Sequence, residues 1–154
     1  MRRIVFIVVV VLIIGVVIDL VLASGYNNYT VRSRLVAAIL AVGDGRSNLE
    51  LACAEGTFAQ KQKTTDIGVS ESDPKVYILR AALLRVTQNV VRLKVTLLDI
   101  YGQPLFFGIL PRIAIPQGSV LEFEYSCSAE KKFSSRLIGS TVEQEYLPRH
   151  LRGL

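Results

Sequence analysis

Residues 4–23 read IVFIVVVVLIIGVVIDLVLA, and this run decides how the chain is organised. No polar side chain occurs from Ile4 to Ile18, and Asp19 is the one charged residue inside the run. About 20 residues at a rise of 1.5 Å each are enough to cross a hydrocarbon core of about 30 Å. The sequence therefore predicts a transmembrane helix within residues 1–25.

The residues on either side of the run indicate how it would be oriented. Arg2 and Arg3 precede it, and nothing equally basic follows directly, so the positive-inside rule places the N-terminus in the cytoplasm and the rest of the chain outside. The alternative is a cleaved signal peptide, because Val21-Leu22-Ala23 before Ser24 also suits a signal peptidase. Either reading exports the remainder of the chain.

Asp19 is an unfavourable residue within a membrane span, since an acidic side chain costs about 3 kcal/mol at the centre of a bilayer. One reading places it near the outer interface, where its carboxylate reaches the lipid headgroups. The other pairs it with a basic group of a neighbouring subunit, which makes Asp19 a candidate subunit-interface residue.

The segment after the apolar run carries the spacing of a helix. Its apolar or small residues alternate at steps of four and three, which places them along one stripe: Val31, Leu35, Ala38, Val42, Gly45, Leu49 and Ala52. Glycines 43 and 45 disfavour a helix interior, but the continuing stripe favours a helix to about Ala54. Residues 26–54 are thus predicted to be the amphipathic half of the same helix.

Other positions between residues 35 and 42 are apolar too, so this part of the helix must be covered on more than one side. A head domain covers one side in this reading, and neighbouring subunits cover the other. The candidate subunit-interface residues here are Val31, Leu35, Ala38 and Val42.

Residues 55–154 are predicted to form a β-rich extracytoplasmic head. Apolar and polar residues alternate over Val91–Leu97 and over Leu121–Cys127, the pattern of strands with one buried face. Further elements are expected as strands at Lys75–Leu79 and Leu105–Ile109, turns at Asp99–Gln103 and Gln117–Gly118, and a loop at Ala59–Lys75. The predicted fold class is α+β, with a long N-terminal transmembrane helix packed on an antiparallel β-meander.

The two cysteines, Cys53 and Cys127, would lie in an exported domain, where oxidation can join them. Two cysteines allow one bridge. The alternative is that both are small buried hydrophobic residues.

Composition excludes several classes of function. The net charge of +5 is spread along the chain, without the basic cluster and interleaved aromatic residues that predict nucleic-acid binding. His150 is the single histidine, so neither a histidine-based triad nor a multi-histidine metal site is expected. We expect no catalytic, cofactor-binding or metal-binding residues, and hence no enzyme.

Short stretches at both ends of the chain resemble a known family. Residues 26–34, which read YNNYTVRSR, closely resemble the membrane-exit stretch of type IVa pilins, and residues 39–43, which read ILAVG, are similar to the small-residue pattern that follows. Near the C-terminus, residues 125–128 (YSCS) and 146–148 (YLP) look like the elements that bound the C-terminal loop of those pilins.

The resemblance implies a non-enzymatic subunit of a type IV pilus, anchored in the inner membrane or part of the filament, whose partners are other pilin subunits. It would act in assembly, adhesion or motility. The sequence also departs from the family, and the helix-bending proline that is usual near the membrane exit is missing. Residues 4–18 contain no glutamate, no processing site precedes them, and Leu151 stands where pilins place a second loop cysteine. The alternatives are a pilin-like accessory protein that stays in the membrane and a soluble exported binding module.

Overall fold

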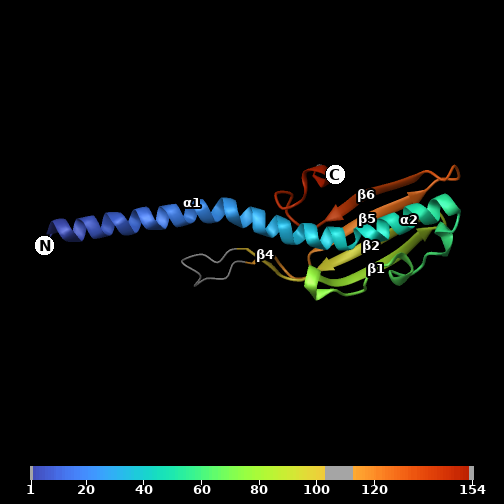
Figure 1. Cartoon of the computed structure of the whole chain (residues 1–154), viewed down its shortest axis with the longest axis horizontal. Helices are drawn as coiled ribbons and strands as arrows, with labels where there is room; N and C mark the ends of the chain where they lie inside the picture. Colours follow the sequence, from blue (N-terminus) through green and yellow to red (C-terminus); the bar gives the residue numbers. More distant parts are fainter. Residues whose placement is uncertain (1, 103–112, 153–154) are drawn as a thin grey trace.

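The computed structural model describes residues 2–102 and 113–152, with side chains described in α1 from residue 6 to 18 and from residue 29 onward. Helix α1 runs from Arg2 to Ala41, and α2 from Gly43 to Glu55. Figure 1 shows the first half of α1 projecting away from the rest of the molecule, while its second half and α2 lie against a sheet. The molecule is therefore a helical stalk joined to an α+β head.

The head is built on an antiparallel four-stranded sheet with the order β1-β2-β5-β6. Its strands are β1 (Ile78–Thr87), β2 (Val90–Leu97), β5 (Val120–Cys127) and β6 (Phe133–Ser140). Across the middle of the sheet, Leu93 of β2 is paired with Phe123 of β5, which is paired with Leu137 of β6. A second, two-stranded sheet joins β3 (Ile100–Tyr101) to β4 (Ile113–Ile115).

The core lies between the helices and one face of the sheet. Alternation along β2 turns Val91, Leu93 and Val95 toward the helices, because successive side chains of a strand point to opposite faces. The two helices and Val42 between them contribute residues that are all at most 2% exposed: Val31, Leu35, Ala38, Val42, Leu49, Ala52 and Cys53. The stripe predicted from the sequence is thus the part of the helix that the head covers.

Short 3₁₀ helices make up much of the connection from α2 to β1 and one turn near the C-terminus. They are η1 (Phe58–Gln60), η2 (Thr65–Ile67), η3 (Pro74–Val76) and η4 (Arg149–Leu151). The amide of Asn48 on α2 donates a hydrogen bond to the Ile67 carbonyl at 2.8 Å, which fixes the η2 segment against α2.

The structure confirms some local predictions and corrects others. Strands β2 and β5 and the turn at Gln117–Gly118 are confirmed. The strand expected at Lys75–Leu79 is wrong in its first half, because η3 occupies Pro74–Val76. The Asp73 carboxylate accepts a hydrogen bond from the backbone amide of Lys75 and so caps the start of η3. The turn expected at Asp99–Gln103 is corrected by β3, and the strand expected at Leu105–Ile109 lies outside the described residues.

The expected transmembrane helix requires a larger correction. In the part of the chain that the structure describes, no helix is both long and apolar enough to cross a membrane. The α+β mixture and the antiparallel sheet are present, but the predicted transmembrane helix is contradicted for the residues that the structure describes.

The buried stripe continues across the break between α1 and α2 at Val42. At Gly45 the stripe lies close to the connection from α2 to β1, which contains Ile67 and Val69. A Cβ atom on Gly45 would lie 2.5 Å from Cγ2 of Val69 and 3.1 Å from Cδ1 of Ile67. Both neighbours are buried, so they have little room to move. A glycine is therefore required at this position by packing.

We expect Gly45→Ala to lower the free energy of unfolding by about 1–3 kcal/mol, as overpacked cores do. Gly43→Ala is the matched control, because nothing lies within 4 Å of its added Cβ, and alanine should there raise helix stability by up to about 1 kcal/mol. Urea denaturation of both variants measures the difference. Equal stabilisation by the two changes would show that α2 does not approach the loop this closely.

Candidate functional site

The stalk half of α1 is the largest exposed apolar surface among the described residues. Phe6 is 71% exposed and Leu12 is 63% exposed, and the exposed residues follow one another along the chain instead of every third or fourth position. They are Phe6, Ile7, Val8, Val9, Val11, Leu12, Ile13, Ile14, Val16, Val17 and Ile18. A helix that is apolar on all sides is normally buried, so this surface, which we call the stalk surface, is a candidate contact site.

The head holds the other half of α1 through both packing and polar contacts. Arg32 donates from Nε to the Glu145 carbonyl at 2.7 Å, and Arg34 donates to the Tyr101 carbonyl. The Arg34 guanidinium also lies 5.9 Å from the centre of the Tyr77 ring. These contacts fix the direction in which the stalk leaves the head.

The candidate interface residues named from the sequence fall into two groups. Val31, Leu35, Ala38 and Val42 are buried in the head, so they contact this chain and not a neighbouring subunit. Asp19 lies within α1, but its side chain is outside the described residues. The structure instead exposes residues 6–18, which the sequence had assigned to lipid.

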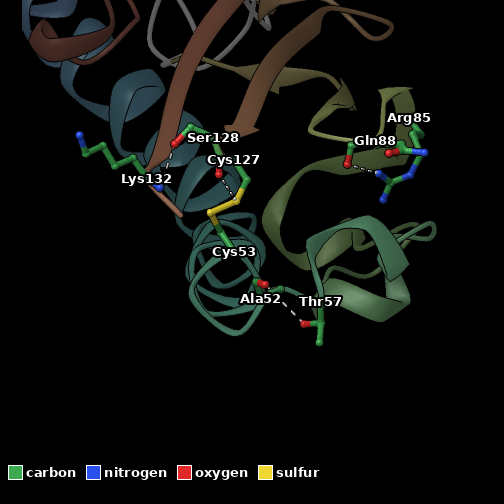
Figure 2. Close-up of a disulfide and its surroundings, with 8 residues drawn as sticks. All are labelled: Ala52, Cys53, Thr57, Arg85, Gln88, Cys127, Ser128 and Lys132. Carbon is green, nitrogen blue, oxygen red and sulfur yellow. Dashed lines mark hydrogen bonds between the residues drawn. A yellow bond between two sulfur atoms is a disulfide. The ribbon is translucent and has the colours of Figure 1, made fainter. Parts of the chain in front are cut away.

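A disulfide joins the two cysteines, with Cys53 and Cys127 having Sγ atoms 2.01 Å apart and Cα atoms 5.6 Å apart. Figure 2 shows this bond between α2 and the end of β5, next to the hairpin that contains Ser128 and Lys132. Cys53 is fully buried. The bond closes the far end of the helix onto the sheet, opposite the end from which the stalk leaves.

The partly buried Arg85 forms several hydrogen bonds that were not predicted from the sequence. It donates from Nη1 to the carbonyls of Thr87 at 3.3 Å and Gln88 at 3.0 Å, and Figure 2 shows it beside Gln88. Its Nη2 donates to the carbonyls of Phe58, at 3.1 Å, and Lys61. The guanidinium thus ties β1 to the η1 segment. The signal in the sequence was one cation inside the apolar run 81–86.

On the outer face of the sheet, Glu124 of β5 is held between two arginines. Its carboxylate accepts from Nε of Arg92 on β2 and from Nε of Arg136 on β6, each at 3.0 Å. The hydrogen bond from Arg136, followed by that from Arg92, lowers the pKa of Glu124 below its usual value of 4.5. Because the folded pKa is the lower one, the stabilisation is present above 4.5 and is lost as the pH falls through the folded value.

The glutamates of β5 therefore serve the sheet. Lys94 faces Glu122 at 3.6 Å across β2 and β5. Among the side chains that the structure describes, no group of three or more from His, Cys, Asp or Glu is placed to hold a metal ion.

The comparisons with known proteins add no family to this picture. No family of known proteins, no curated protein and no solved structure matches the chain significantly.

Proposed function

We propose that the protein is a pilin-like assembly subunit, which associates with other copies through the stalk surface and carries its head at the outside of the assembly. The observation that carries this proposal is the all-round exposure of apolar side chains over residues 6–18. Burial of apolar surface yields about 25 cal/mol per Å². A stalk that stays exposed to water does not gain this free energy of burial, whereas a stalk packed against neighbours gains it along residues 6–18.

Second copies of this chain are the partners that fit the stalk surface. A helix that is apolar on every side needs neighbours on several sides, and parallel copies provide them, because each brings an identical apolar helix. The bulky head lies at one end of the stalk only (Figure 1), so stalks can pack together while the heads stay at the periphery. The similarity of residues 26–34 to type IVa pilins supports the same arrangement.

The disulfide supports an extracytoplasmic position for the head. Disulfides persist in oxidising compartments and are rare in the cytosol, and the bond between Cys53 and Cys127 joins two secondary structure elements of the head. We therefore place the head outside the cytoplasm, on the cell surface or in a pilus, with contributions to adhesion or motility made through the assembly.

The test is to place charges on the stalk surface. Val8→Glu combined with Leu12→Glu puts two carboxylates one turn apart on α1, and an unpaired buried charge costs several kcal/mol. We expect association to weaken at least a hundredfold, measured by sedimentation velocity and by electron microscopy of the assemblies. Leu84→Glu is the matched control, because Leu84 is an exposed leucine on β1 of the head, and it should assemble as the wild type does.

Two outcomes would contradict the proposal. One is assembly of the double variant at wild-type strength. The other is a wild-type protein that remains monomeric at high concentration and co-floats with lipid vesicles, which would assign the stalk surface to lipid.

A further inference from the structure

A pocket lies beside the break between the two helices, between α1, α2, strands β5 and β6, and the C-terminal segment. Its volume is about 630 Å³, within the range of about 300–1,000 Å³ that small-molecule sites occupy. Most of its lining is apolar and includes Val36, Ile39 and Leu40 of α1, Leu137 of β6 and Leu151 of η4. We call it the junction pocket.

The polar groups in the junction pocket are positive or neutral. Among the described residues, no aspartate or glutamate lines it, whereas Arg46, Arg136 and Arg152 do. Arg136 is already held by Glu124, and Arg152 donates to the carbonyls of Leu147 and Glu145. Arg46 differs from both, since its exposed guanidinium forms no ion pair or hydrogen bond with the described residues. One cation is thus free to meet a ligand.

Tyr125 supplies the second polar group. The residue is 2% exposed and lines the junction pocket, yet its hydroxyl makes no hydrogen bond within the part of the chain that is described. Tyr125 therefore adds a buried polar residue to the wall of the junction pocket.

The surroundings of Tyr125 keep its hydroxyl neutral and in place. Its ring stacks between those of Phe123 and Phe133, with centroids 6.4 Å and 6.0 Å away. Burial raises the pKa of Tyr125 to about 12, and the nearby charge of Arg46 acts in the opposite direction. The hydroxyl is thus a hydrogen-bond donor at neutral pH, in the same pocket as the Arg46 guanidinium.

We propose that the junction pocket binds a fatty-acid-type carboxylate, with its carboxylate held by Arg46 and the Tyr125 hydroxyl and its single alkyl chain lying along Val36, Ile39 and Leu137. A guanidinium and one hydroxyl donor match the two oxygens of a carboxylate. The apolar wall matches an unbranched chain, and the arginines among the described lining residues repel a cationic amphiphile.

The test is isothermal titration of the full chain with laurate, below the concentration at which laurate forms micelles. We expect binding of one laurate per chain, weakened about tenfold or more by Arg46→Gln and by Tyr125→Phe, since hydrogen bonds to charged groups contribute that much. Arg80→Gln removes an exposed charge on β1 and should bind laurate as the wild type does. Thermal melting of each variant checks that it is folded.

Dodecylammonium, which has the same chain length and the opposite charge, separates this site from general apolar binding. It should not bind the junction pocket. Three results would overturn the proposal: no binding of laurate to the wild type, unchanged binding by both folded variants, or equal binding of dodecylammonium, which would indicate adsorption to apolar surface such as the stalk.

Discussion

Replacing both cysteines, as in Cys53→Ala with Cys127→Ala, should lower the free energy of unfolding by about 4 kcal/mol, because the bond closes a long loop in the unfolded chain. The two residues are 74 positions apart in the sequence. For a domain of this size that loss should shift the melting temperature by roughly 10 °C or more. Thermal and urea denaturation of the double variant and the wild type measure both quantities.

A reducing agent provides the matched control for this prediction. Reduced wild-type protein should approach the stability of the double variant, whereas the variant itself should not respond to the reducing agent. A loss below about 1 kcal/mol would contradict the prediction, since removal of a native disulfide from a small exported domain normally costs about 2–5 kcal/mol.

Truncation of one leucine of α2 should have a comparable effect. Leu49 is fully buried between α2 and the sheet, so Leu49→Ala removes apolar contacts and leaves a cavity, which costs about 2–5 kcal/mol. Leu51→Ala is the matched control on the same helix, because Leu51 is 58% exposed and its truncation should change stability by less than about 1 kcal/mol. Urea denaturation of both variants, with the slope compared, measures the difference.

The outcome for Leu51 also tests the arrangement of the head. Equal destabilisation by the two truncations would mean that Leu51 is covered, and would contradict a helix that presents one face to the sheet and the other to solvent.

The parts of the fold that the sequence predicted are those in which one face of an element is buried. In β2 and β5 every second residue is buried, so their alternation is visible in the sequence. The helical stripe from Val31 to Ala52 was visible for the same reason. Strand β6 was missed because it lies at the sheet edge, where Leu137 is its one buried residue and no regular alternation marks it.

The sites depend on contacts between distant residues, which the sequence does not display. Cys53 and Cys127 meet because α2 crosses the end of β5, and two cysteines in a sequence do not reveal that crossing. The junction pocket likewise brings Arg46 of α2 to Tyr125 of β5. Apolar residues in the stalk were visible in the sequence, and their number together with Arg2 and Arg3 in front of them led to the prediction of a membrane span.

The Arg85 contact has a consequence for how the head responds to salt. Dissolved ions screen attraction between charged side chains over about 10 Å at 0.1 M, and the pairs of Glu124 with Arg92 and Arg136 lie on the outer face of the sheet, where the arginines are exposed. The partners of Arg85 are neutral carbonyl oxygens, so no opposing charge is there to be screened. Rising ionic strength should therefore weaken the ion pairs on the outer face of the sheet, whereas the hydrogen bonds by which Arg85 joins β1 to η1 should be unaffected.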